Sequence, residues 1–233
     1  MINSALAKFV KSAPASDKVK TCPIRVRRIT DADLRWWDKY AKPMIEIIEP
    51  TRPDATWDWW IITALDAAFA YSLRQQPECF SIVTDVPTSG KKPREVICGL
   101  IQLVGRYEYL LDHSLSSVYI WYLSTTPVET LQAFFGSKPL PKLLGQILLD
   151  VGVTRSFQLG WDGRTGLYAD DGGNEELLDF YTNSLRCGMT ALAKTYPLPS
   201  VLRSRLRPNN GRYCYFTEAA AENFYKKLTP YRT

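Results

Sequence analysis

Anion binding is the chemistry that the residues from Val118 to Gly145 favour most. Val118 to Leu123 is a run of β-branched and aromatic residues, which is typical of a strand buried on both faces. A helix follows this strand, and the start of a helix leaves N–H groups unpaired with the positive end of the helix dipole behind them. Gly145 would let a phosphate approach these N–H groups closely, although a glycine here is equally well explained by packing.

Other reactive residue types are sparse. His113 is the one histidine of the chain, so a multi-histidine metal centre is excluded and a Ser-His-Asp arrangement would depend on a residue in a polar loop. The five cysteines form no C-x-x-C pair, which argues against a disulfide framework or a zinc site and favours a reducing compartment. Asp170 to Asn174 lacks the ligand spacing of a calcium loop, and we interpret it as a turn and N-cap.

Isolated polar residues supply a few weaker candidates. Glu108, Asp112 and His113 are the polar groups nearest in sequence to the strand that could act as a base, but solvated loop residues are the preferred interpretation. Arg164 is a candidate phosphate or acceptor contact, and an arginine in a solvent-exposed turn is the commoner case.

A helix and a second strand should position the anion site. The helix is indicated by apolar residues at spacings of three and four, namely Leu140, Leu143, Leu144, Ile147, Leu148 and Val151. It should begin near Lys142, because Pro139 and Pro141 cannot sit inside it. Apolar residues then alternate from Phe157 to Trp161, which predicts a strand. Two strands joined by a helix should lie parallel and adjacent, with a ligand where they end.

The rest of the chain also alternates between strand and helix patterns. The expected elements are strands at 24–29, 80–84, 96–104, 190–194 and 212–216, and helices from 30, at 54–76, 175–185 and 219–227. Thr30 and Thr217 are the expected N-caps of the first and last helix. The segment between Pro127 and Pro139 is expected to be a partly apolar loop.

In order and spacing these segments resemble the GCN5-related N-acetyltransferase (GNAT) family. YIWYLSTTP resembles its fourth strand, LLGQILLD the helix with its pyrophosphate loop, FYTNSLRCGM its FY-x-x-x-G-[FM] element, and IRVRRITDADL its first strand and helix. The likeness covers about Ile24 to Phe216. It implies an α/β (α+β) fold: a mixed, mostly antiparallel seven-stranded sheet flanked by helices, with one parallel strand pair and a C-terminal helix.

The resemblance implies an N-acetyltransferase in which an amine attacks acetyl-CoA directly. It places the cofactor against the backbone of Leu123, Ser124, Thr125, Leu143, Leu144, Gly145 and Gln146. Tyr181 would protonate the departing thiolate, although an aromatic residue on a helix face is its ordinary explanation. Trp57 and Trp59 would line the acceptor site, with core packing the preferred explanation for Trp57.

The chain departs from the family in its phosphate signature, which is Gln or Arg, two residues, Gly, one residue, then Gly or Ala. Leu140, Leu143 and Gly145 match these positions, so one glycine is retained. Several members carry a glutamate in the fourth strand where Trp121 stands here, which leaves the general base unassigned. A second hypothesis is therefore a related fold with weakened or lost cofactor binding that acts as an interaction or regulatory protein.

Length and charge set the wider expectations. We expect a flexible lead-in at 1–22, a GNAT-like domain at 23–217 and a helical extension at 218–233, in a soluble cytoplasmic protein without a secretory signal or membrane span. The net charge of the chain is +5. Residues from Lys194 onward include eight basic and two acidic residues, a net charge of +6, so residues 1–193 carry a net charge of −1. Arg203, Arg205 and Arg207 suit a phosphate-bearing or acidic partner, and a solvated loop is the alternative. The amine acceptor is left open between a small molecule, a protein and an RNA-linked amine, and the oligomeric state is open, a dimer included.

Overall fold

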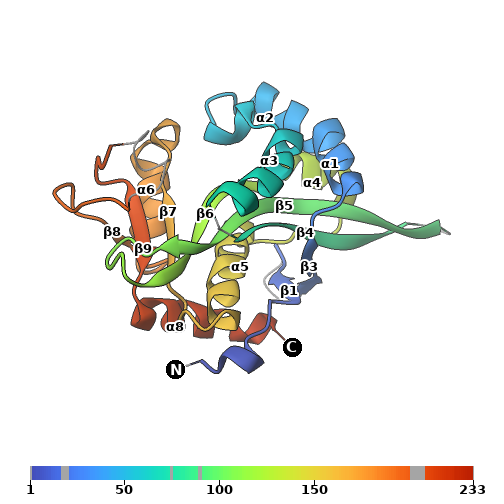
Figure 1. The fold of residues 1–233 in the computed structure, drawn as a ribbon. Coiled ribbons are helices and arrows are strands. Elements are labelled where there is room, and N and C mark those ends of the chain that lie inside the picture. Colours follow the sequence, from blue (N-terminus) through green and yellow to red (C-terminus); the bar gives the residue numbers. More distant parts are fainter. Residues whose placement is uncertain (1, 17–20, 74–75, 89–90, 200–207, 233) are drawn as a thin grey trace.

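A single seven-stranded sheet organises the chain in the computed structural model, which describes residues 2–16, 21–73, 76–88, 91–199 and 208–232 (Figure 1). The strand order is β3-β4-β5-β6-β7-β9-β8, and every neighbouring pair is antiparallel except β6 and β7. The strands are β3 (Arg25–Arg28), β4 (Gln76–Thr88), β5 (Lys91–Glu108), β6 (Ser116–Thr125), β7 (Thr165–Tyr168), β8 (Thr190–Ala191) and β9 (Tyr213–Phe216). The predicted mixed sheet with one parallel pair is confirmed.

Helices cover both faces of this sheet. They are α1 (Asp31–Trp36), α2 (Lys42–Ile48), α3 (Trp59–Leu73), α4 (Val128–Phe135), α5 (Leu144–Gln158), α6 (Asn174–Thr182) and α8 (Glu218–Lys227). Short helical turns are η1 (Ser4–Leu6), η2 (Trp37–Ala41), η3 (Pro53–Thr56), η4 (Asp171–Gly173) and η5 (Thr229–Tyr231). Ile82 packs in the core cluster that holds residues of α5 and α8, whereas Val83 packs in the cluster that holds residues of α1 to α3. Figure 1 shows α5 and α8 on one side of the sheet and α1 to α3 on the other. Successive strand residues point to opposite faces, so these two sets of helices sandwich the sheet.

The strand predicted at Phe157–Trp161 is wrong. Helix α5 runs through Gln158, and the parallel partner of β6 is β7 at Thr165–Tyr168. Twelve of the fifteen residues of α5 are buried, so its apolar residues do not define one helical face. Near the C-terminus of the helix they alternate with polar residues, which is the pattern expected of a strand. Asp162 and Gly163, both at positive φ, form a turn that leads into β7 rather than out of a strand.

Other boundaries shift in the same way. The predicted helix at Asp54–Gln76 is divided into η3 and α3, and the predicted loop after Pro127 contains α4. The last helix begins as expected at its N-cap Thr217, whose side chain accepts a hydrogen bond from the Ala220 N–H. Thr30 caps α1 in a reciprocal capping box with Asp33.

The N-terminal residues expected to be a flexible lead-in carry ordered elements. Besides η1 they form β1 (Ser12–Pro14), which pairs with β2 (Thr21–Pro23) in a small second sheet. Val10 and Ala13 are fully buried in the same core cluster as the apolar residues of α5. The division into a lead-in, a domain and an extension stays a prediction. In the described ranges, no helix is long and apolar enough to cross a membrane.

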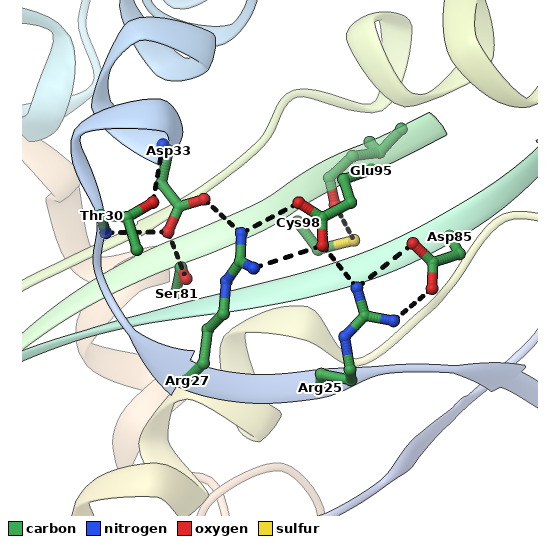
Figure 2. Close-up of polar contacts among 9 residues, drawn as sticks. Arg25, Arg27, Thr30, Asp33, Ser81, Asp85, Glu95 and Cys98 are labelled. Atoms are coloured by element: carbon green, nitrogen blue, oxygen red, sulfur yellow. Dashed lines mark hydrogen bonds and ion pairs between the residues drawn. The ribbon is translucent and has the colours of Figure 1, made fainter. Parts of the chain in front are cut away.

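A charged network ties the first helix to the sheet edge (Figure 2). Arg25 of β3 binds Asp85 of β4 and Glu95 of β5, the latter at 2.6 Å. Arg27 binds Glu95 at 3.1 Å and Asp33 of α1 at 2.7 Å. Hydrogen bonds from Arg25 lower the pKa of Asp85. The network therefore ties α1 to three strands, β3, β4 and β5.

Candidate functional site

The parallel strand pair separates at the point where a ligand was expected. Its register runs from Val118 opposite Thr165 to Ile120 opposite Leu167, and β7 then ends at Tyr168. Strand β6 continues to Thr125, paired on its other side with β5. The edge of β6 beyond Ile120 thus has no strand partner within the described part of the chain, and its backbone groups border an opening in the sheet.

A cavity of about 580 Å³ occupies this opening. Its lining comes from β6 (Leu123, Thr125), α6 (Phe180, Tyr181), η3 (Pro53, Asp54) and the turn at η4. A second cavity of about 450 Å³ lies beyond the start of α5 and is lined by Leu143 and Leu144. Thr125 and Gly145 border both cavities, so the two lie next to each other at the end of β6 and are together called the recess.

The N-terminus of α5 meets this recess with unused N–H groups. The first helical hydrogen bond runs from the Ile147 N–H to the Leu143 carbonyl at 2.8 Å, so the helix does not use the N–H groups of Leu144, Gly145 and Gln146. Leu143 is the N-cap, with φ 59° and ψ 23°. This left-handed conformation costs a leucine about 1–2 kcal/mol. The loop therefore has the shape that a glycine adopts freely, although a leucine occupies the position.

Gly145 satisfies both explanations offered for it. A Cβ atom at this position would lie 3.1 Å from Cζ of Phe180, so the helix and α6 pack closely here. The same residue lines both cavities. The absent side chain thus allows the packing of α6 and leaves the backbone open to the recess.

Gln146 contributes a buried acceptor next to these N–H groups. Its Nε2 donates to the Arg186 carbonyl at 3.1 Å, which links α5 to the turn after α6. Its Oε1 is buried and has no hydrogen-bond partner among the described residues. Gln146 is in the lining of neither cavity.

Tyr181 lines the first cavity with its side chain 7% exposed. Burial raises the pKa of Tyr181, and the nearby Cys187, Cys214 and Asp54 add to the shift. The hydroxyl therefore stays protonated across the physiological range, which is the state a proton donor requires.

An ion-paired turn that sequence reasoning missed closes the recess opposite α6. Arg52 donates to both carboxylate oxygens of Asp54, at 2.8 and 2.6 Å, and to the Thr125 carbonyl at 2.9 Å. The Ser124 hydroxyl donates to Asp54. These contacts fasten η3 to the end of β6. The only sequence feature that could have indicated these contacts is the pairing of Arg52 and Asp54 on either side of Pro53.

The remaining predicted residues are divided. Trp57 lines the first cavity with its ring centroid 4.8 Å from that of Tyr122, whereas Trp59 is buried against Trp37 and lies outside the lining. Trp121 also lines the cavity.

The weaker polar candidates lie away from the recess. Arg164 is buried and binds Glu218 at 2.6 Å and the Ser116 carbonyl at 3.1 Å, at the far end of β7. Asp112 and His113 border a separate hollow. Arg203, Arg205 and Arg207 lie outside the described residues.

Neither a protein-family model nor a curated protein sequence matches the chain. Several solved structures are similar to it. A tyrosine-to-phenylalanine mutant of the AtaT toxin bound to the C-terminus of the antitoxin AtaR is 14% identical, with a TM-score of 0.45 over 86% of this chain and 96% of that one. Spermidine N-acetyltransferase from Vibrio cholerae, in complex with CoA and spermine, is 12% identical, with a TM-score of 0.43 over 86% and 98%. A GNAT-family acetyltransferase from Staphylococcus aureus Mu50 is 14% identical, with a TM-score of 0.41 over 82% and 97%. Two of these similar structures are named as acetyltransferases, and one of the two as a member of the GNAT family. The roles of residues in this chain rest on its own geometry.

Proposed function

We propose that the protein is an acetyl-CoA-dependent N-acetyltransferase that moves the acetyl group to a primary amine by direct attack. The observation that carries the proposal is the separation of β6 from β7, which opens a recess bordered by the start of α5 and by Tyr181. A recess at this position gives a thioester donor and an amine acceptor a common place to meet at the β6 edge.

The start of α5 is suited to the diphosphate of the donor. The N–H groups of Leu143 to Gln146 and the positive end of the helix dipole supply hydrogen bonds and favourable charge without a basic side chain. The pantetheine arm would then follow the free edge at Leu123 to Thr125.

At the β6 edge, backbone N–H groups polarise the thioester carbonyl in this proposal. The amine nitrogen forms a bond to the carbonyl carbon, and the carbon–sulfur bond breaks. Tyr181 gives its hydroxyl proton to the departing sulfur and is reprotonated from water. The surplus proton of the new amide leaves through water in this proposal. Asp54 is not its acceptor, because Arg52 and Ser124 already occupy both of its carboxylate oxygens.

Calorimetric titration with acetyl-CoA tests the proposal. We expect binding with a dissociation constant well below millimolar, followed by release of free CoA thiol when a panel of primary amines is added. Affinity weaker than millimolar, or binding without thiol release for any amine, would contradict the enzymatic function.

One observation favours a second candidate. Leu143 is 40% exposed beside the second cavity, where the family signature has glycine, and its side chain narrows the approach to α5. A protein of the same fold that binds CoA weakly and acts as an interaction or regulatory protein would share this feature. The titration separates the two, because this candidate predicts no saturation at millimolar acetyl-CoA.

A further inference from the structure

The loop that enters α5 is paired with the N-terminal segment, over residues 14–16 and 140–142. The Lys142 N–H donates to the Pro14 carbonyl at 2.8 Å. Ser16 makes a reciprocal pair with Leu140: its N–H donates to the Leu140 carbonyl at 2.9 Å, and its hydroxyl accepts from the Leu140 N–H at 3.0 Å. Ala15 and Pro141 form a β-bridge between these bonds. A short antiparallel pairing thus ends one residue before Leu143.

The N-terminal partner in this pairing is itself anchored in the core. Ala13 and Ala15 are 0% and 1% exposed, and β1 pairs with β2. The Lys11 N–H donates to the Tyr231 carbonyl at 2.7 Å, and the Lys11 carbonyl accepts from the Ile24 N–H at 2.8 Å. The segment at residues 14–16 is therefore a fixed support, against which the loop is held.

Leu143 is the residue that needs such a support. Its φ of 59° is a conformation that a leucine leaves unless the surrounding structure imposes it, whereas a glycine adopts it readily. A change of φ at Leu143 would also turn the N–H groups of Leu144 to Gln146 away from the recess, because they follow it directly in the chain. The shape of the anion site thus depends on what holds residues 140–142.

We propose that Ser16, together with the edge of β1, is the positioning element of the anion-binding loop. It holds residues 140–142 so that Leu143 keeps the left-handed conformation that a glycine would adopt unaided. The identity of the anion as acetyl-CoA rests on the proposed function. The conformation of Leu143 is a property of the protein alone.

Two variants of Ser16 test this proposal in graded steps. Ser16→Ala removes the hydroxyl acceptor, and Ser16→Pro removes the N–H donor as well. Ser12→Ala is the control, since it also removes a serine hydroxyl that bonds a backbone group; the Ser12 hydroxyl, at the start of β1, donates to the Tyr231 carbonyl at 3.4 Å. Thermal denaturation confirms that each variant is folded.

The first measurement needs no ligand. Three-bond NMR couplings report the φ of Leu143, and we expect a positive value in the wild type and in Ser12→Ala, with a shift toward negative values in Ser16→Pro. An unchanged positive φ in a folded Ser16→Pro protein overturns the proposal, whether or not the protein is an acetyltransferase.

The second measurement is acetyl-CoA affinity by calorimetry. We expect a loss of about fivefold in Ser16→Ala and about 20-fold in Ser16→Pro, in line with one and two lost hydrogen bonds. Adding Leu143→Gly should reduce the effect of Ser16→Pro to about twofold or less, because glycine keeps a positive φ without support. An equal loss in both backgrounds overturns the proposal, whereas absent binding by the wild type contradicts the proposed function and leaves the NMR result to decide.

Discussion

Tyr181 is the side chain for which a chemical role is most sharply testable. Tyr181→Phe keeps the buried ring and removes the proton donor, so folding and acetyl-CoA affinity should be nearly unchanged. Turnover should fall by about 10²- to 10⁴-fold, toward the low end if water replaces the phenol. Single-turnover kinetics with a working amine measure the loss. Tyr225→Phe is the matched control, because Tyr225 is equally buried but lies in α8 outside the cavity lining, and full turnover of Tyr181→Phe would remove Tyr181 from the mechanism.

The pH dependence follows from the same burial. An acid acts in its protonated form, and burial raises the pKa of Tyr181 above the ordinary phenol value of about 10. Deprotonation of Tyr181 therefore should not reduce kcat between about pH 7 and pH 10. A kcat profile over this range checks the expectation. A descending limb near pH 8 to 9 that disappears in Tyr181→Phe would show that the pKa is lowered instead.

A negative charge introduced at Gly145 would lie beside the proposed position of the diphosphate of acetyl-CoA. Gly145→Asp should weaken acetyl-CoA binding by at least tenfold more than Gly145→Asn does, since the two side chains have the same shape and meet Phe180 alike. Calorimetric affinities of the two folded variants measure the difference. Equal affinities would place the diphosphate elsewhere.

At the scale of elements, Arg212 holds the turn that forms one wall of the cavity. It is buried and donates to the carbonyls of Ala169 at 2.7 Å, Asp170 at 3.0 Å and Asn174 at 2.6 Å, so it fixes the chain between β7 and α6. Arg212→Lys keeps the charge but loses the planar fork, and we expect the KM for the acceptor to rise about tenfold with the affinity for acetyl-CoA unchanged.

Arg164→Lys is the control for this variant. Arg164 is equally buried and also binds a backbone carbonyl, but it lies at the opposite end of β7, away from the recess. The Arg164→Lys variant should have a lower melting temperature and an unchanged KM for the acceptor. A similar rise in KM in both variants would mean that general loosening of the sheet, rather than the position of the turn, is responsible.

The order of elements could be predicted from sequence because each strand and helix carries its own local pattern. The strand predicted to begin at Val118 was found for this reason as part of β6, and Leu123, Thr125 and Gly145 of the predicted site line the first cavity. The position of β7 was missed, because helix α5 is buried on nearly all sides and gives no helical periodicity at its end. Contacts between distant segments produce no local sequence pattern. Arg52 bonds Thr125, which is 73 residues away in the sequence, and Ser16 bonds Leu140, which is 124 residues away.

At the scale of the whole molecule, an ion pair joins the end of the chain to its central helix. Arg232 binds Asp150 of α5 at 2.5 and 2.9 Å, with side chains 7% and 0% exposed, and also donates to the Lys8 carbonyl at 2.6 Å. Arg232→Met leaves a buried carboxylate without its partner and should cost about 3–5 kcal/mol of unfolding free energy. Urea denaturation measures this loss. Replacing both residues, as Asp150→Leu with Arg232→Met, should restore most of it, and no recovery would show that the contacts of Arg232 with backbone carbonyls dominate.

The same ion pair has a consequence for synthesis of the chain on the ribosome. Asp150 and Arg232 are 82 residues apart, so at about 5–20 residues per second the carboxylate is made roughly 4 to 16 s before its partner. During that interval, α5 can enter the core only by burying an uncompensated charge or by taking up a proton. The strands from β3 to β6 can pair while translation continues, but the layer that contains α5 should close only once Arg232 has emerged. The order of synthesis thus separates the assembly of the two faces of the sheet.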